Sequence, residues 1–127
     1  MGEHFEGDRA VLLVDDAPEL RITLRWMLGA ASFAIVDEAD DGAGAIALAL
    51  ERDYDVAVVD FSLPDMDGPE VARRLAQLRP GCRIAAFTAS SDTAVEAAFE
   101  AAGVRAFFEK TQLGELVDWA ERAAARW

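Results

Sequence analysis

The sequence predicts an α/β protein built as (βα)5, with a doubly wound, five-stranded parallel sheet in the order 2-1-3-4-5. Short apolar runs alternate with amphipathic stretches along the chain, and most runs are continuous, as in strands that helices cover on both faces. The connections are short, and there is no internal repeat or low-complexity segment. The length of 127 residues corresponds to one domain. We expect a flexible tail over residues 1–9 and a folded domain over residues 10–127.

Each element is predicted from the spacing of its apolar residues. In a strand they alternate or form a continuous run, and in a helix they recur about every 3.6 residues. The expected strands are Ala10–Val14, Phe33–Val36, Val56–Val59, Ile84–Phe87 and Val104–Phe108. The expected helices lie around Leu20–Leu28, Ala45–Leu50, Val71–Leu78, Ala94–Ala102 and Leu113–Ala120. The positions of proline and glycine agree with these helix boundaries. Pro18 and Pro69 suit the first turn of a helix, and Gly103 suits the end of the fourth helix.

The charge and the cysteine content exclude several classes of protein. The formal net charge is −12, which argues against direct nucleic-acid binding. A single cysteine, Cys82, can form neither an internal disulfide nor a zinc site by itself. The polar, acidic N-terminal segment lacks the apolar core of a signal peptide, and no apolar run has the length of a membrane span. We therefore expect a soluble, cytoplasmic protein that does not interact with a membrane.

Polar residues follow the predicted strands at their carboxyl ends. Asp15 and Asp16 follow the first strand, Asp60 ends the third, Thr88 ends the fourth, and the fifth reaches Lys110. In the order 2-1-3-4-5 the first and third strands are neighbours at the point where strand order reverses, which is where such sheets bind ligands. Two carboxylates about 5 Å apart repel by roughly 3 kcal/mol at an effective dielectric constant near 20. Hard oxygen donors of this kind suit Mg²⁺ or Mn²⁺.

Several short strings together resemble the receiver domains of two-component response regulators. They are LLVDDAPELR, VVDFSLPDMDG, FTAS and GVRAFFEK, with EADDGAGA after the second strand, and they occur in the family's order at family-like spacing. The similarity covers residues 10–124. It implies a flavodoxin-like fold and a domain that signals by accepting a phosphoryl group, while only assisting its own phosphorylation and dephosphorylation.

The resemblance also implies a role for each matching residue. Asp60 would accept a phosphoryl group from a phosphohistidine on a histidine kinase or histidine phosphotransfer protein. Lys110 and the Thr88 hydroxyl would contact phosphoryl oxygens, and Phe107 would be the aromatic residue that turns inward when Thr88 moves. The ligands of Mg²⁺ would be Asp15, Asp16, Asp60 and the backbone carbonyl of Ser62.

Two sets of aromatic and apolar residues are expected at surfaces. Ile22 and Trp26 fall off the apolar face of the first helix, and in receiver domains that side commonly docks the kinase. The alternative is that Trp26 only covers a groove. Trp119 lies off the buried face of the last helix and is a candidate for an output or dimer surface with Arg105 and Phe107. An effector domain or a downstream protein would receive the signal.

Some questions stay open at this point. The family often has proline after the lysine through a cis bond, whereas Thr111 follows Lys110 here, so the conformation of that bond is undecided. A haloacid-dehalogenase-type phosphohydrolase would need a second acid where the chain has Ser62. A receiver-like module that signals without phosphate would not need the intact set of acids, threonine and lysine. A flavodoxin-like FMN binder would need a hydroxyl- and glycine-rich loop after the first strand, which the sequence lacks.

Overall fold

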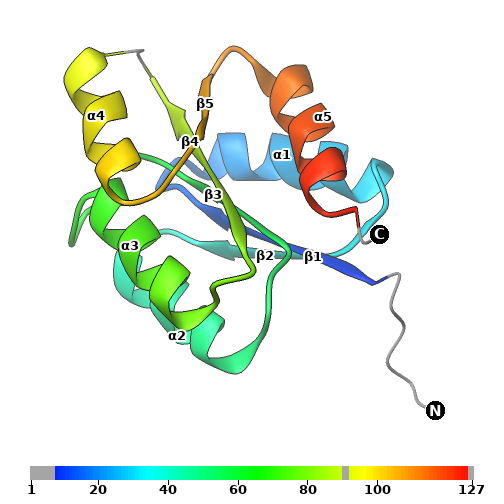
Figure 1. The fold of residues 1–127 in the computed structure, drawn as a ribbon. Coiled ribbons are helices and arrows are strands. Elements are labelled where there is room, and N and C mark those ends of the chain that lie inside the picture. Colours follow the sequence, from blue (N-terminus) through cyan, green and yellow to red (C-terminus); the bar gives the residue numbers. More distant parts are fainter. Residues whose placement is uncertain (1–7, 90–91, 126–127) are drawn as a thin grey trace.

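The structure, a computed structural model, describes residues 8–89 and 92–125 (Figure 1). Five strands and five helices alternate along this part of the chain. The strands are β1 (Arg9–Val14), β2 (Phe33–Ala39), β3 (Val56–Val59), β4 (Arg83–Thr88) and β5 (Ala106–Glu109). The helices are α1 (Pro18–Ala30), α2 (Gly42–Glu51), α3 (Gly68–Leu78), α4 (Thr93–Ala101) and α5 (Leu113–Ala123).

The sheet is parallel throughout and has the order β2-β1-β3-β4-β5. The predicted fold class and strand order are therefore confirmed. Helices α1 and α5 cover one face of the sheet, and α2, α3 and α4 cover the other (Figure 1). Each face has its own apolar core, one around Leu24 and Leu116 and the other around Val71 and Phe99. The central strand β3 is buried at every position, which explains its continuous apolar run.

Several element boundaries differ from the prediction, and three strands show why. Strand β1 begins at Arg9, so the expected tail of residues 1–9 is too long by at least one residue, and its residues 1–7 lie outside the described part. Strand β2 continues to Ala39, because an edge strand tolerates polar side chains. Strand β5 begins at Ala106, because the chain first leaves α4 through Gly103, whose φ is +96°, the left-handed conformation that glycine favours.

Helix starts follow the local sequence signals. Pro18 and Pro69 lie in the first turns of α1 and α3, as predicted. Three helices begin after an aspartate whose carboxylate accepts a backbone N–H of the first turn, namely Asp41 before α2, Asp67 before α3 and Asp92 before α4. None of the described helices is long and apolar enough to cross a membrane.

Candidate functional site: an acidic pocket at the carboxyl edge of the sheet

The register of β1 and β3 brings the three predicted carboxylates together. Val14 pairs with Val59, so Asp15 and Asp60 are the first residues beyond the paired ends of the two strands. The backbone N–H of Asp60 donates to the carbonyl of Val14 over 2.9 Å. Asp15, Asp16 and Asp60 each offer a carboxylate oxygen within 4.8 Å of the others. Asp15 and Asp60 are buried, at 4% and 8% exposure, whereas Asp16 is exposed.

Lys110 supplies the cation of this pocket. Its backbone N–H donates to the carbonyl of Thr88, which places its side chain at the same edge of the sheet. Its Nζ lies 2.8 Å from Oδ2 of Asp15 and 3.0 Å from Oδ2 of Asp60. Within the described residues, Lys110 is the only side-chain cation within ion-pair distance of Asp15 or Asp60. Two of the three carboxylates therefore share one ammonium group.

The remaining carboxylate oxygens are held by the backbone. Oδ1 of Asp15 accepts from the N–H of Ala17 over 2.9 Å, and Oδ1 of Asp60 accepts from the N–H of Phe61 over 2.7 Å. Each buried aspartate therefore has one oxygen on a backbone donor and the other on Lys110. These contacts fix both carboxylates in orientation before any ligand enters.

Burial raises the pKa of Asp60, and the nearby charge of Asp15 raises it further. The hydrogen bonds from Lys110 and from the N–H of Phe61 oppose this shift but do not cancel it. Burial alone would lower the pKa of Lys110, but its contacts with Asp15 and Asp60 outweigh burial and raise it, so the ammonium stays charged at neutral pH. The pocket therefore keeps an excess of negative charge.

This donor set fits a hard divalent cation. Carboxylate oxygens are the ligands that Mg²⁺ and Mn²⁺ prefer, and the exposure of Asp16 leaves a path for an ion with its waters. A further positive charge here would relieve the repulsion that one lysine leaves. Ser62, whose carbonyl the resemblance assigns to the same ion, lies two residues beyond Asp60 in the β3–α3 loop and is exposed.

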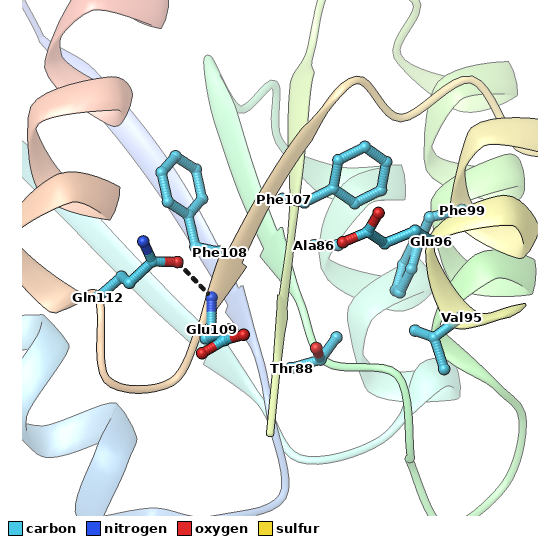
Figure 2. Close-up of a pocket in the computed structure, with 9 residues that line it drawn as sticks. All are labelled: Ala86, Thr88, Val95, Glu96, Phe99, Phe107, Phe108, Glu109 and Gln112. Atoms are coloured by element: carbon cyan, nitrogen blue, oxygen red, sulfur yellow. Dashed lines mark hydrogen bonds between the residues drawn. The ribbon is translucent and has the colours of Figure 1, made fainter. Parts of the chain in front are cut away.

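Thr88 and Phe107 lie beside a cavity between β4, β5 and α4 (Figure 2). Thr88 ends β4 and is 9% exposed. The cavity has a volume of about 100 Å³, and Val95 and Phe99 also line it. Phe107 and Phe108 project to opposite sides of β5, and only Phe107 packs with the core of α2, α3 and α4 (Figure 2).

The residues expected at surfaces have different positions. Ile22 and Trp26 on α1 are 58% and 77% exposed. Trp119 is partly buried, and its ring centroid lies 6.0 Å from that of Phe108. Trp119 therefore packs α5 onto the sheet and does not join Phe107, which lies on the other face. No peptide bond among the described residues is cis, so the bond between Lys110 and Thr111 is trans.

Three residues near the pocket escaped the sequence analysis. Arg21 of α1 donates to the backbone carbonyl of Asp15. Asp65 of the β3–α3 loop accepts from the N–H groups of Gly42 and Ala43, and so ties that loop to the start of α2. Gly68, at the start of α3, lies behind the carbonyl of Asp60, which leaves no room for a Cβ atom. Only the contacts of Asp65 join segments far apart in the sequence, whereas those of Arg21 and Gly68 link a strand end to the helix that follows it.

The fold and the pocket together define a class of protein. A 2-1-3-4-5 sheet that gathers three carboxylates, a threonine and a lysine at its carboxyl edge is the arrangement expected of a receiver-type domain. The family model of the response regulator receiver domain matches residues 11–121. The chain belongs to this family, the phosphoacceptor domains of two-component response regulators.

Individual relatives agree with this assignment. A candidate transcriptional regulator of Pseudomonas aeruginosa is 34% identical over 108 residues, which are 84% of this chain and 52% of that protein. The chemotaxis protein CheY of Thermotoga maritima is 26% identical over 102 residues, which are 80% of this chain and 85% of that protein. The crystal structure of a LuxR-family two-component response regulator from Aurantimonas has a TM-score of 0.83 at 30% identity, with 92% of this chain and 85% of that chain covered.

The curated relatives differ in length from this chain. The match spans about half of the Pseudomonas protein, and 27% of the transcriptional regulatory protein ResD of Bacillus subtilis, which is 43% identical over 65 residues. The Thermotoga CheY, by contrast, is covered almost in full. Receiver domains with this sequence pattern therefore occur both in longer regulators and in proteins of this size.

Proposed function

We propose that Asp60 is the phosphoacceptor of this receiver domain and that it takes a phosphoryl group from a phosphohistidine of a histidine kinase or phosphotransfer protein. The observation that carries this proposal is the excess negative charge around Asp60, a buried carboxylate whose only side-chain counter-ion among the described residues is shared with Asp15. A structural aspartate at the end of a strand has no need of such neighbours. The phosphoryl donor is made from ATP, so we place the reaction in the cytoplasm.

The chemistry follows from the groups present. A carboxylate oxygen of Asp60 attacks phosphorus, the P–N bond of the phosphohistidine breaks, and an acyl phosphate forms. The transition state is loose, with its charge on the peripheral oxygens, so positioning and cations do most of the catalysis. The ammonium group of Lys110, 3.0 Å from Oδ2 of Asp60, is close enough to reach one phosphoryl oxygen. The hydroxyl of Thr88 is assigned to another.

Mg²⁺ would be held by Asp16 and Asp60, with Asp15 through water and the carbonyl of Ser62 completing the protein's share. Bound there, the cation supplies positive charge that offsets the repulsion between the acidic pocket and an incoming phosphoryl group. Asp15 is already fixed by Ala17 and Lys110, which suits a residue that orients a water molecule more than one that moves.

The signal would leave the pocket through Thr88 and Phe107. A new anion on Asp60 attracts Lys110 and the hydroxyl of Thr88. A shift of Thr88 toward Asp60 opens the cavity that Thr88 and Phe107 line. The ring of Phe107 is already partly buried beside this cavity, so a small rotation would move it inward. Because phenylalanine has no hydroxyl group, packing alone would stabilise the rotated state.

The exposed side of α1 is proposed to dock the kinase or phosphotransfer protein. Trp26 is 77% exposed, and Ile22 lies one helical turn before it at 58% exposure. We expect Trp26→Ala to slow phosphotransfer from the cognate kinase and to leave phosphorylation by acetyl phosphate unchanged. Leu50→Ala is the matched control, since Leu50 is an apolar residue of similar exposure on α2. Equal rates for both variants would contradict docking at Trp26.

The main experiment is phosphorylation of the full chain by acetyl phosphate with Mg²⁺, followed by intact-protein mass spectrometry. We expect one phosphoryl group on the wild type, none on Asp60→Ala, and none when EDTA removes Mg²⁺. Asp53→Asn is the control, because it removes an exposed carboxylate from the other edge of the sheet. Full labelling of Asp60→Ala would overturn the assignment.

The rival function is a phosphohydrolase with Asp60 as nucleophile. It would need a general acid two residues later, where the chain has Ser62. Steady turnover of a generic phosphate ester would favour this rival, whereas a single phosphorylation event per chain supports the receiver. The output is proposed to be an effector domain or a separate protein, as in the longer regulators that share this domain.

A further inference from the structure

We propose that Arg21 is a positioning residue of the acidic pocket, which holds the peptide between Asp15 and Asp16 and so sets the direction of the Asp16 carboxylate. This inference rests on the proposed function, because it concerns the same cation site. Arg21 lies on α1, outside the set of residues that the resemblance assigns to the site. It touches no carboxylate of the pocket and acts through the backbone.

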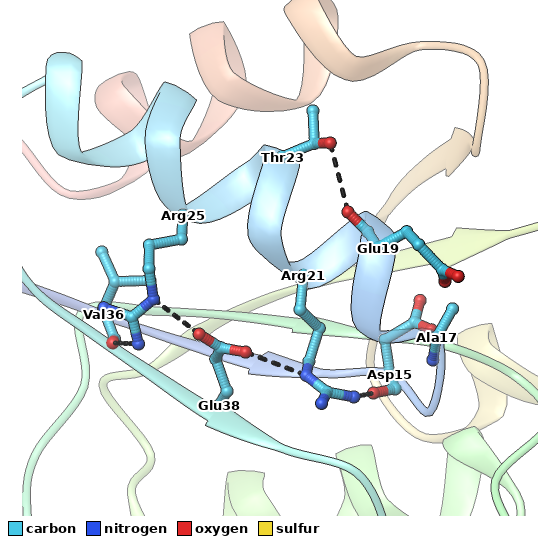
Figure 3. Close-up of polar contacts among 8 residues, drawn as sticks. All are labelled: Asp15, Ala17, Glu19, Arg21, Thr23, Arg25, Val36 and Glu38. Atoms are coloured by element: carbon cyan, nitrogen blue, oxygen red, sulfur yellow. Dashed lines mark hydrogen bonds and ion pairs between the residues drawn. The ribbon is translucent and has the colours of Figure 1, made fainter.

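The guanidinium group of Arg21 bridges two segments (Figure 3). Its Nη1 donates to the backbone carbonyl of Asp15, and its Nε donates to Oε1 of Glu38 on β2 over 2.9 Å. The side chain of Arg21 is only 16% exposed. An arginine presents its donors in a rigid plane, so two contacts of this kind fix the position of the group.

Glu38 is itself held from the other side. Arg25, one turn later on α1, contacts Oε2 of Glu38 over 2.6 Å and donates to the carbonyl of Val36 over 2.8 Å (Figure 3). Burial would raise the pKa of Glu38, but the two arginines outweigh burial and lower it, so the carboxylate stays charged at neutral pH. Arg21 is therefore anchored at Glu38, which lies on β2 outside the acidic pocket.

The bond to Asp15 matters because of what the adjacent peptide carries. The N–H of Asp15 donates to the carbonyl of Ala39 over 3.1 Å, so β2 holds one end of the residue and Arg21 holds the other. The carbonyl of Asp15 belongs to the peptide that leads into Asp16. Asp16 is exposed, so its direction depends on that backbone. Without the bond to Arg21, repulsion from Asp15 and Asp60 would turn the peptide and carry the carboxylate of Asp16 away from theirs.

A role of Arg21 through its charge and a role through positioning predict opposite changes in cation affinity when Arg21 is removed. A positive charge near the pocket repels a divalent cation, so its loss by charge alone would tighten cation binding. Loss of the bond to Asp15 would instead spread the ligands and weaken binding. Arg25 is the matched control, because it carries the same charge and contacts the same Glu38, but its described bonds go to Glu38 and Val36 and not to Asp15.

The test uses Mn²⁺ as the probe and the full chain without a phosphoryl donor. Electron paramagnetic resonance measures free Mn²⁺, and competition with Mg²⁺ shows that both ions share one site. We expect Arg21→Met to weaken Mn²⁺ binding about tenfold, the effect typical of residues that orient metal ligands. Arg25→Met should change it less than about twofold, or tighten it slightly. Thermal unfolding in EDTA is measured for both variants.

Each outcome has one meaning. Equal affinities for the two variants, or tighter binding by Arg21→Met, would overturn the role of Arg21 and leave the proposed function intact. If the wild type binds no Mn²⁺ that Mg²⁺ displaces, the cation site itself fails, and both proposals fall. Should Arg21→Met not fold, Arg21→Lys replaces it, because lysine keeps the charge but cannot reach both acceptors, and the same weakening is expected.

Discussion

The carboxyl and amino edges of the sheet both carry acidic residues, and they differ in how the charge is balanced. At the carboxyl edge, Asp15, Asp16 and Asp60 converge within 4.8 Å, and in the part of the chain that the structure describes only Lys110 pairs with the two buried ones. This arrangement leaves unbalanced negative charge at the place where the strand order reverses.

At the amino edge, Asp55 and Asp53 each have a partner of their own. Asp55 accepts from the N–H of Ala10 over 2.9 Å, which ties the start of β3 to β1. Asp53 pairs with Arg79 over 3.1 Å. Cys82 lies beside these acids, and burial together with their charges raises the pKa of its thiol to about 12, so it stays protonated and inert.

The difference separates structural acids from functional ones. A carboxylate that stabilises the fold is placed opposite a donor that belongs to it. The acids of the pocket are instead placed opposite one another, which costs stability until a cation arrives. The number of acidic residues at an edge therefore says less about function than their pairing does, and the following experiments test that contrast from the largest effect to the smallest.

The largest expected effect concerns a glycine at each edge. A Cβ atom on Gly68 would lie 2.1 Å from the carbonyl oxygen of Asp60, which is backbone and cannot yield, and 2.8 Å from Cζ of Phe99. We expect Gly68→Ala to lower the free energy of unfolding by about 3 kcal/mol. Gly81, at the amino edge, has nothing within 4 Å of its Cβ position, so Gly81→Ala should change it by less than about 0.5 kcal/mol. Urea unfolding of both variants measures this contrast, and similar losses would contradict it.

The second effect has the opposite sign, because removing a pocket acid should stabilise the cation-free protein. In EDTA at neutral pH we expect Asp60→Asn to raise Tm by about 3–5 °C, the shift that roughly 1 kcal/mol produces in a domain of this size. Excess Mg²⁺ should raise the Tm of the wild type more than that of Asp60→Asn. Asp55→Asn is the amino-edge control and should lower Tm with or without Mg²⁺. A lower Tm for Asp60→Asn in EDTA would refute the idea of unbalanced charge.

The stabilisation expected for Asp60→Asn should depend on pH. Because burial raises the pKa of Asp60 in the folded state, the folded protein binds this proton more tightly than the unfolded chain does. Ionisation of Asp60 therefore lowers the free energy of unfolding of the wild type. This loss develops as pH rises from the ordinary carboxyl pKa of 3.8 past the raised pKa. The advantage of Asp60→Asn should be full above the raised pKa and should vanish in acid, as followed by Tm across a pH series.

A third effect, of similar size to the second, is expected in the connection from α2 to β3. Tyr54 is 4% exposed, and its hydroxyl donates to Asp37, which also pairs with Arg52 over 3.2 Å. Tyr54→Phe should lower the free energy of unfolding by about 1 kcal/mol, the value of one hydrogen bond. The loss should be the same with EDTA and with Mg²⁺, since this contact does not involve the pocket. A loss that depends on Mg²⁺ would show that the two regions are coupled.

The smallest effect is expected for the ion pairs of Glu38. These are partly exposed, so Glu38→Gln should lower the free energy of unfolding by only about 0.5 kcal/mol at neutral pH. Since the pKa of Glu38 lies below its ordinary value of 4.5, this stabilisation is complete above 4.5 and is lost as pH falls through the lowered pKa. The difference between wild type and variant should shrink in acid and in high salt. Urea unfolding over pH and salt checks both trends.

The fold was predictable because its signals are local. Continuous apolar runs, such as the one over Val56–Val59, mark strands that are covered on both faces, and proline in a first turn marks a helix start. The end of β2 was missed because Asp37 and Glu38 interrupt its apolar pattern. Their side chains are satisfied by arginines from other elements, which the pattern within one strand does not show.

The acids of the pocket were predictable as a set for a related reason. Each one follows a strand, and parallel strands end at the same edge, so the sequence together with the strand order placed Asp15 beside Asp60. The expected association of Trp119 with Phe107 failed, because Trp119 packs on Phe108, which faces the opposite side of β5. Which of two adjacent aromatic residues a helix covers depends on the layer above the sheet.

By itself the sequence determined the order of the elements, the family, and the identity of the acids, threonine and lysine at the carboxyl edge, because these depend on local periodicity and on strand ends. Only the tertiary structure decided that Lys110 is shared by two buried carboxylates, that Arg21 reaches the backbone of Asp15 from α1, and that Gly68 lies against Asp60. Each of these contacts joins residues of different segments, and Lys110 is far from both Asp15 and Asp60 in the chain. Their distances are set by how helices pack on the sheet, which no short stretch of sequence specifies.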